Sequence, residues 1–534
     1  MISKYFQRVI CFACVLFCFQ CANRGIASGG DKDTTPPKVI NSYPENFSTN
    51  FKGNEIRIFF DEYIKLKNLQ KNLIISPPMD PAPEITPLGS ASKYITIKIY
   101  DSLVTNTTYA FNFGNSIEDN NEGNVLPFYR YVFSTGDNID SLSINGFVYD
   151  ALEKDVSAPS FVLLHEVDSN YNDSLIFKKK PKYIGTTDSL SQFKIKNLKA
   201  GKYLLIALQE ENTDYIYQPK KDKFAYNSNF IEIPSDTLYY LKLFKQFDNS
   251  KFVRAKQLAS GRIGFGYEGD SSSIKITPIL PQIDNNNFTI SKEPEKDTLN
   301  FWYKPRKPLL DSLLFEVASQ KNIDTVNIKL RSMKKDSLNF KPLTSVLKLG
   351  ENFIINSTIP VFELDSEKIT VINKDSISIK SLCTMDPFNN KVKIKFKMAE
   401  DERYKIKLLP GALTDFYGSK NDTLNFSANT KPLSSYGNLR LSLRNANFPL
   451  IVQIVSKNWE VKAEKILKTN NVIDFIDLDP GTYYVRAIFD ANNNGDYDPG
   501  NFLEGRQPEK VSYASEMLEV RAGWDAIEEF TLNN

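Results

Sequence analysis

The sequence predicts an all-β chain of tandem small β-sandwiches behind an export leader, and three observations support this expectation. Apolar and polar residues alternate with a period of two in many short segments, such as residues 54–60, 94–99 and 392–397. This is the pattern of strands with one buried face. Clusters of Asn, Asp, Gly, Pro and Ser separate these segments, and few stretches show the helical period of 3.6. Stacked sandwiches are the simplest way to bury such strands.

The first twenty residues have the features of a signal peptide. Two basic residues precede an apolar run, residues 9–19, which is too short to span a bilayer. A cut before Cys21 would leave a cysteine at the mature N-terminus, followed by a flexible tether that ends at residue 32. Lipid attached to Cys21 would supply more than one hydrophobic chain, as stable anchoring requires. Cleavage at Cys14 and simple secretion without a lipid are the alternatives.

Composition excludes several classes of function. Without Lys4 and Arg8 of the leader, acidic and basic residues balance at 64 each, so nothing drives binding to nucleic acid. Four of the five cysteines lie in the leader region and only Cys383 remains, so no disulfide can form within the mature chain. The single histidine, His165, lies in a strand-like run and is expected to be structural. Phosphate-binding loops and nucleophile elbows are absent from the sequence.

The chain also repeats itself. Residues 193–207 and 473–487 share an apolar pair, a leucine, a glycine, a tyrosine and an alanine at the same spacing. The physical interpretation is a strand, a tight turn at the glycine and a returning strand. This pattern resembles the prealbumin-like sandwich of carboxypeptidase regulatory domains, which are accessory modules without catalytic residues. The resemblance implies two such modules here.

A second pattern starts near residue 33. A Tyr-led strand at 107–113, an acidic loop and a strand containing Phe133 follow one another, and a weaker copy at 403–428 matches Phe426 to Phe133. The first copy resembles the bacterial Ig-like domain near the N-terminus of many Bacteroidetes-type outer-membrane lipoproteins. The organisation expected is a signal peptide at 1–20, a lipid tether at 21–32, an Ig-like domain at 33–138, a prealbumin-like domain at 139–238, an additional sandwich at 239–340, a more weakly suggested second Ig-like domain at 341–433 and a second prealbumin-like domain at 434–534.

One loop has the spacing of a calcium site. Oxygen-bearing side chains occupy positions 1, 3, 5 and 9, with Gly495 at position 6, and calcium needs several oxygens on a sharply turning backbone. Position 12 is Asn501 instead of a glutamate, so Glu504 would have to substitute. A turn rich in Asn and Asp without metal is the alternative. The predicted Ca²⁺ ligands are the side chains of Asp490, Asn492, Asn494 and Asp498 and the carbonyl of Asp496.

A tripeptide of Asp, Ser or Thr, and an apolar residue recurs eleven times, where composition would give about two or three. It resembles the acceptor motif for O-glycosylation of exported proteins in Bacteroidetes-type bacteria. Turns that lead into strands are the competing explanation. The candidate acceptors are Ser102, Ser141, Ser174, Ser189, Thr237, Thr298, Ser312, Thr325, Ser337, Ser376 and Thr423.

These features favour a non-enzymatic, lipid-anchored scaffold or interaction protein of the outer membrane, at the cell surface. By analogy, it is expected to act as an external accessory subunit of an outer-membrane β-barrel machine for protein assembly or transport. A surface protein that binds glycans or other polymers is the alternative, because aromatic residues could stack on sugars. We expect Trp302 and Trp524 to be core anchors instead. An enzyme is disfavoured because Asp61 and Glu62 point to opposite faces of a strand.

Overall fold

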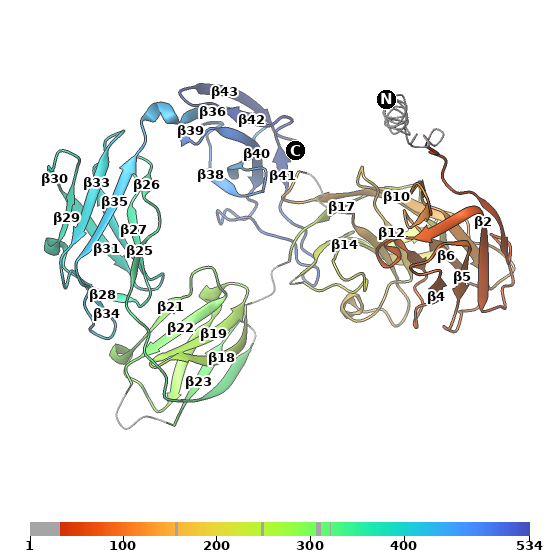
Figure 1. Ribbon diagram of the computed structural model, residues 1–534, viewed down its shortest axis with the longest axis horizontal. Coiled ribbons are helices and arrows are strands. Elements are labelled where there is room, and N and C mark those ends of the chain that lie inside the picture. The colour runs from red at the N-terminus through yellow and green to blue at the C-terminus, as the bar shows by residue number, and fades with distance from the viewer. Residues whose placement is uncertain are drawn as a thin grey trace, which may run out of the picture. The chain divides into compact units, whose positions relative to one another are not determined.

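The computed structural model describes residues 32–154, 159–219, 221–246, 250–305, 311–320 and 322–533 (Figure 1). Cys21 and the predicted leader lie outside these ranges. Within them, strands dominate, which confirms the prediction of an all-β chain of tandem β-sandwiches. No helix in the described ranges has both the length and the apolar character to cross a membrane. The helical segments there are α2 (Leu69–Asn72) and short 3-10 turns at Asp173–Phe177, Ser271–Ser273, Asn285–Asn287, Ser366–Lys368 and Leu433–Ser435.

The chain divides into two compact units. The first contains the described residues up to Ser143 together with Lys182–Ile184 and Lys196–Lys199, and the second contains the rest. Several sandwiches lie within the second unit, and each of three has its own buried apolar cluster. The boundaries of the five domains expected from the sequence therefore stay predictions.

The first unit is a sandwich whose apolar cluster includes Ile56, Ile58, Ile95 and Phe111, all fully buried. Ile56 and Ile58 come from residues 55–66, a strand in which buried and more exposed positions alternate. One sheet has the order β4-β5-β2-β7-β8 with β1 on β2, and the other has the order β3-β6-β9. The strands are β1 (Val39–Tyr43), β2 (Glu55–Leu66), β3 (Ile74–Ser76), β4 (Glu84–Thr86), β5 (Ser92–Lys98), β6 (Thr108–Asn112), β7 (Ile117–Asp119), β8 (Val125–Leu126) and β9 (Arg130–Ser134).

Two sandwiches share one topology, as the sequence repeat predicts. In each, a three-stranded sheet with a parallel pair faces a five-stranded sheet. The earlier copy has sheets β13-β10-β17 and β12-β11-β14-β15, with β16 on β14. Its strands are β10 (Leu142–Asp150), β11 (Phe161–Glu166), β12 (Tyr183–Thr186), β13 (Gln192–Leu198), β14 (Gly201–Gln209), β15 (Lys223–Tyr226), β16 (Ile231–Ile233) and β17 (Leu238–Leu243).

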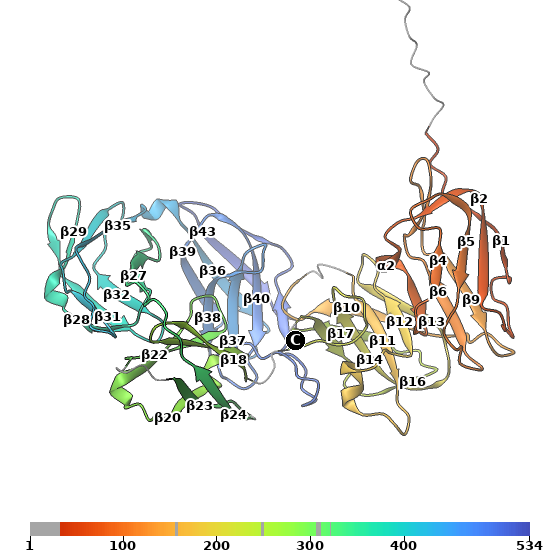
Figure 2. The same ribbon diagram turned by 60° about the horizontal axis from the view of Figure 1, so that its bottom comes forward.

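The later copy ends the chain, and Figure 2 shows its strands together. Its sheets are β39-β36-β43 and β38-β37-β40-β41, with β42 on β40. Its strands are β36 (Gly437–Arg444), β37 (Leu450–Val455), β38 (Val461–Leu467), β39 (Val472–Leu478), β40 (Gly481–Phe489), β41 (Val511–Tyr513), β42 (Leu518–Val520) and β43 (Asp525–Thr531). We call this the last sandwich, and its counterpart the second sandwich.

Between the two copies lie a third and a fourth sandwich. The third has sheets β18-β19-β22-β21 and β20-β23-β24, formed by β18 (Lys251–Ala259), β19 (Arg262–Glu268), β20 (Lys275–Leu280), β21 (Phe288–Lys292), β22 (Thr298–Tyr303), β23 (Ser312–Ala318) and β24 (Ile323–Lys329). The fourth has sheets β25-β27-β32-β31, β26-β35-β33-β29-β30 and β28-β34. Its strands are β25 (Phe340–Pro342), β26 (Val346–Leu347), β27 (Phe353–Ser357), β28 (Val361–Leu364), β29 (Ile369–Ile372), β30 (Ser378–Ile379), β31 (Ser381–Asp386), β32 (Lys391–Phe396), β33 (Arg403–Leu408), β34 (Leu413–Asp415) and β35 (Leu424–Thr430).

The weaker sequence repeat corresponds to a shared hydrogen-bonding device. In the first sandwich, the Tyr109 hydroxyl accepts the backbone N–H of Val104 at 2.9 Å. In the fourth, the Tyr404 hydroxyl accepts the backbone N–H of Ala399 at 2.6 Å. Each tyrosine is almost fully buried and fixes the loop that precedes its own strand. The two sandwiches therefore close the same corner in the same way.

The structure corrects the alignment of these two copies at their last strand. The sequence pattern matches Phe133 to Phe426, yet Phe133 lies opposite Tyr109, whereas Ala428 lies opposite Tyr404. Ala428 is therefore the counterpart of Phe133, two residues beyond the predicted match. The two phenylalanines share a sequence context but not a ladder position. The partner of each tyrosine lies 24 residues further along the chain in both copies, so the two copies align without a gap and the match of Phe426 to Phe133 is two residues out.

Candidate functional site

The loop after β40 carries the predicted calcium ligands and is closed by its own hydrogen bonds. Asp490 is fully buried, and its carboxylate accepts the backbone N–H groups of Asn494 at 3.1 Å and Gly495 at 2.9 Å. The side-chain amides of Asn492 and Asn494 both donate to Asp498 Oδ2. Their oxygens accept the backbone N–H groups of residues two positions further on. The predicted ligand oxygens therefore form successive Asx turns.

Glu509 completes this loop, although no sequence motif singled it out. One carboxylate oxygen accepts the Ala491 N–H at 2.8 Å and the other accepts the Asp498 N–H at 3.1 Å, while burial raises the pKa of Glu509. Glu504 pairs with Arg506 at 3.6 Å. In the part of the chain that the structure describes, no three His, Cys, Asp or Glu side chains form a group that could hold a metal ion. Calcium binding here stays a prediction.

Replacement of Asp490 by alanine is expected to destabilise the last sandwich by about 2 kcal/mol, because two backbone N–H groups lose their buried acceptor. Amide hydrogen exchange should accelerate at Asn494 and Gly495. The control is Asp496→Ala, which removes an exposed side chain from the same loop and should leave exchange unchanged. Equal effects of the two substitutions would contradict the structural role of Asp490. A calcium titration that leaves the Tm of the wild-type chain unchanged would count against the metal.

The candidate acceptors for O-glycosylation are all accessible to some degree. Eight of the eleven hydroxyl residues are exposed, and Ser174, Thr298 and Ser312 are half-buried. Exposure is what a glycosyltransferase needs, but a surface turn has the same property. Glycosylation therefore stays a prediction at these positions.

His165 and Cys383 lie where chemistry is disfavoured. His165 is buried in β11, where burial lowers its pKa to about 4, so the imidazole is neutral at physiological pH. Burial raises the pKa of the Cys383 thiol, and this residue forms no disulfide. A neutral buried imidazole and a protonated thiol are typical of structural residues.

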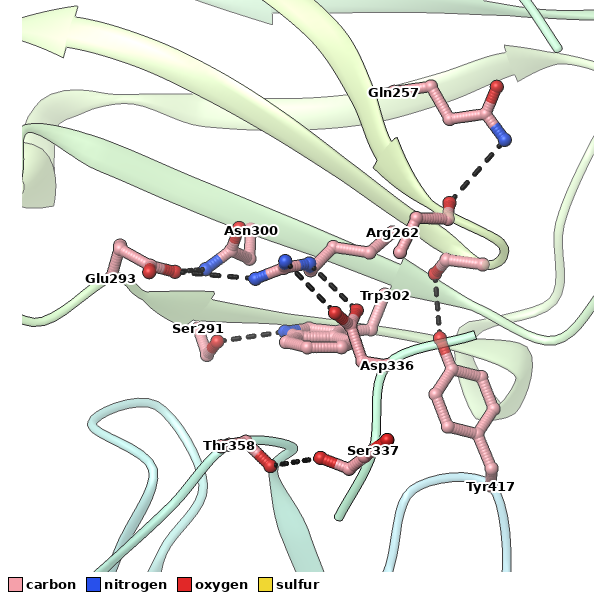
Figure 3. Close-up of polar contacts among 12 residues, drawn as sticks. Gln257, Arg262, Ser291, Glu293, Asn300, Trp302, Asp336, Ser337, Thr358 and Tyr417 are labelled. Carbon is pink, nitrogen blue, oxygen red and sulfur yellow. Dashed lines mark hydrogen bonds and ion pairs between the residues drawn. The ribbon is translucent and has the colours of Figure 1, made fainter. Parts of the chain in front are cut away.

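The junction of the third and fourth sandwiches is built around Trp302 (Figure 3). On β22, Leu299, Phe301 and Tyr303 face the core of the third sandwich, so Trp302 points out of the opposite face. It is nevertheless fully buried, because it clusters with Ile359 and Phe416 of the fourth sandwich. Its indole N–H donates to Ser291 Oγ at 2.8 Å.

An arginine lies over this tryptophan. The Arg262 guanidinium lies 5.2 Å from the Trp302 ring centroid, a cation–π contact. Its Nε lies 2.9 Å from Asp336 Oδ2, and its Nη1 lies 3.5 Å from Glu293 Oε2. Burial raises the pKa of Asp336, while Arg262 opposes this rise. Asn300 is fully buried and donates to Glu293 at 2.6 Å. The outer face of this sheet therefore carries a partly exposed polar network beside the buried indole.

Two further contacts cross the same junction. Tyr417, from the loop after β34, donates its hydroxyl to the Gly261 carbonyl at 2.8 Å. The Lys292 N–H donates to the Phe388 carbonyl at 2.7 Å. Both bonds join strand ends of the third sandwich to loops of the fourth. The junction thus combines an aromatic cluster with ion pairs and backbone hydrogen bonds, which favours one fixed orientation.

The junction of the fourth and last sandwiches depends on Lys348. Its ammonium group donates to the Asp477 carbonyl at 2.7 Å and pairs with Asp479 at 3.2 Å. The same group lies 5.3 Å from the Tyr436 ring centroid. One flexible side chain therefore joins a loop of the fourth sandwich to the turn before β40.

The last sandwich also contacts the second one, far back in the sequence. The Leu152 carbonyl accepts hydrogen bonds from Arg486 Nη1 and from the Tyr513 hydroxyl. Lys154 donates to the carbonyl of Ser515 at 2.7 Å. Arg486 is almost fully buried, and its Nε donates to Gln453 at 2.6 Å. We call this contact the return junction.

An aromatic side chain anchors the return junction. Phe502, in the loop between β40 and β41, is 8% exposed and packs edge-on against Phe224 at 5.5 Å and Tyr226 at 5.1 Å between ring centroids. Its backbone N–H donates to Gln246 Oε1 at 3.2 Å. The neighbouring Leu503 is 61% exposed. The long loop after β40 is therefore a docking element as well as a turn.

The prediction that both tryptophans are core anchors is right about the burial of Trp302, which lies at a junction between sandwiches and not in the core of its own, and is wrong for Trp524. Trp302 is fully buried, but Trp524 is 62% exposed, with the Arg521 guanidinium 5.5 Å from its ring centroid. Trp524 precedes β43 at the edge of a sheet, where no second layer covers it. An apolar residue beside a terminal strand was not sufficient evidence of burial.

Comparisons with known proteins describe part of the chain. No curated protein matches the sequence. Solved structures with some likeness include the surface layer protein SbsC, domains 1-6, at 11% identity over 91% of this chain and 67% of that chain, with a TM-score of 0.14. The Bacillus anthracis TIE protein has 10% identity over 95% and 76%, with a TM-score of 0.15. Likenesses this low carry no conclusion about function. Residues 33–135 match the family model of the bacterial Ig-like domain, so the first described sandwich is assigned to that domain family.

Proposed function

We propose that the chain is a non-enzymatic scaffold of the outer membrane, anchored by lipid on Cys21 and acting at the cell surface. In this role it is an external accessory subunit of a β-barrel machine for protein assembly or transport. The observation that carries the proposal is the interlocking of the second unit. Side-chain contacts connect its sandwiches at the Trp302 junction, the Lys348 junction and the return junction.

Interlocked junctions suit a scaffold. Domains joined by flexible linkers alone move independently, whereas buried aromatic and ionic contacts hold them in one orientation. A fixed frame presents loops and sheet edges to a partner without the entropy cost of ordering them on binding. The buried networks at these junctions hold the frame together, so catalysis is not needed to explain them.

The partner is tested by affinity purification from native membranes through a C-terminal tag. The proposal expects an outer-membrane β-barrel protein to be enriched with the tagged chain. Recovery of no outer-membrane protein above background would contradict it. An untagged strain processed in parallel sets that background.

The anchor is tested by Cys21→Ser. The variant is expected to leave the membrane fraction almost completely, because one or more acyl chains would be lost and no described helix can replace them. Every sandwich should still fold, because the buried apolar clusters of the described sandwiches are formed by residues from Val39 onward. Cys14→Ser is the matched control and should stay in the membrane fraction. A Cys21→Ser variant that remains lipid-anchored would refute the assignment of this cysteine.

A further inference from the structure

A groove of ≈ 540 Å³ lies along one edge of the last sandwich, where residues of β42 and β43 line it. Leu441, Val485 and Phe530 line it and belong to the buried apolar cluster of this sandwich. The groove therefore reaches the core between the two sheets. Apolar side chains of a bound segment could extend that core.

The main chain of β43 borders this groove. β43 is the last strand of its sheet and pairs only with β36 within the described residues. The groove is lined by residues 525, 526 and 528–530 of this strand. Successive side chains of a strand point to opposite faces, so a groove against one face would be lined by every second residue. Consecutive residues line this groove, and the edge of β43 therefore faces it. A strand edge offers N–H and C=O groups that can pair with an added strand.

The groove carries a strong negative charge. Five carboxylates line it, together with a single cation, Arg521, which is paired with Glu519 at 2.8 Å. Among the described residues, neither Glu516 nor Glu528 forms an ion pair. The carboxylates are those of Glu516, Glu519, Asp525, Glu528 and Glu529.

Glu528 has an unusual position in its strand. It lies on the same side of β43 as Phe530, which is 1% exposed and packs into the core, yet Glu528 is exposed. A charge on the inward side of an edge strand prevents pairing with another copy of the same edge. The other carboxylates of the groove have the same effect, because the like charges of two copies would repel each other. The charges that exclude a second copy attract a basic segment.

We propose that this groove binds an extended, basic segment of a partner protein, in which Lys or Arg alternates with Val, Ile or Leu. The segment adds to the free edge of β43 and directs its apolar residues toward Leu441 and Val485. Its cations then lie on the opposite face of the strand, the side of Asp525 and Glu529, while Glu516 and Glu528 add to the negative charge around the bound segment. Trp524 borders the same groove and is available to cover the bound chain. The inference deepens the proposed scaffold function and rests on it, because it specifies how a partner is held.

The test uses the full chain and a labelled peptide of alternating Lys and Val, seven residues long to match β43. Fluorescence anisotropy should show saturable binding that weakens as salt rises. The double variant Glu516→Lys with Glu528→Lys should weaken binding about tenfold or more. The single variant Glu516→Lys changes a residue on an exposed loop and should also weaken peptide binding. Glu460→Lys reverses an exposed charge of the same sandwich outside the groove and should bind as wild type.

A second peptide separates strand addition from simple charge attraction. Replacing each Val by Pro keeps the cations but removes backbone donors, and this peptide should bind about tenfold more weakly. Equal binding of the two peptides, or binding unchanged in the double variant, would overturn the proposal. So would self-association of the wild-type chain that the double variant abolishes.

The two proposals fail in different ways. A tagged double variant that recovers the same outer-membrane partner as wild type would refute the groove and leave the scaffold function standing. A wild-type chain that binds the peptide but recovers no membrane partner would refute the scaffold function instead. If the wild-type chain recovers the partner and the double variant does not, the result supports both the scaffold function and the groove.

Discussion

Replacement of Trp302 by alanine is expected to lower the free energy of unfolding of the third and fourth sandwiches by about 3–5 kcal/mol. The side chain is fully buried at their junction. Its loss leaves a cavity beside Ile359 and Phe416 and removes the ring under the Arg262 guanidinium. Urea denaturation followed by circular dichroism measures the change.

Trp524→Ala is the matched control for this prediction. It removes the same side chain from a surface where it is 62% exposed, so the free energy of unfolding should change by about 0.5 kcal/mol or less. Hydrogen exchange should localise the effect of Trp302→Ala to the strands on both sides of the junction. Equal destabilisation by the two substitutions would contradict the assigned role of Trp302.

Replacement of Phe502 by alanine is expected to open the return junction. Losing the buried ring should cost about 3 kcal/mol of docking free energy, which raises the open population roughly a hundredfold. Each sandwich should stay folded, because the Phe502 ring packs on Phe224 and Tyr226 across the junction. Hydrogen exchange should accelerate near Leu152 and in the loop around Phe502, with little change elsewhere.

The neighbouring residue provides the control. Leu503 is 61% exposed, so Leu503→Ala should leave exchange at the return junction unchanged. If Phe502→Ala behaved like Leu503→Ala, the ring would contribute no docking energy. The interlocked frame would then lack its main apolar contact between the second and last sandwiches.

Local pattern was sufficient to predict the strands and the stronger repeat. The spacing shared by residues 193–207 and 473–487 describes a strand, a turn and a returning strand, all of which form between near neighbours in sequence. The two segments therefore form equivalent hairpins in sandwiches of identical topology. The weaker repeat was predicted less accurately, because the shared phenylalanine does not mark the same place in its last strand. The ladder position opposite the tyrosine is held by Phe133 in one copy and by Ala428 in the other.

The sites were harder to predict because distant residues determine burial. Trp302 lies within β22 and Trp524 directly before β43. Trp302 is buried because the fourth sandwich covers it, which the local sequence around either residue does not reveal. Phe502 lies in a polar loop, and the rings it contacts lie much earlier in the chain. In the Asp490 loop, the spacing typical of calcium ligands also suits Asx turns, which compete for the same oxygens.

The most direct test of the interlocked frame is amine cross-linking of the wild-type chain in native membranes, followed by mass spectrometry. Lys242 belongs to the second sandwich and Lys510 follows β40 in the last one. Burial lowers the pKa of Lys242, and the positive charge of Lys510 lowers it further. The frame predicts abundant cross-links between Lys242 and Lys510, and their loss in Phe502→Ala. Cross-links confined to single sandwiches in the wild-type chain, with none between these two lysines, would contradict the frame on which the proposed function rests.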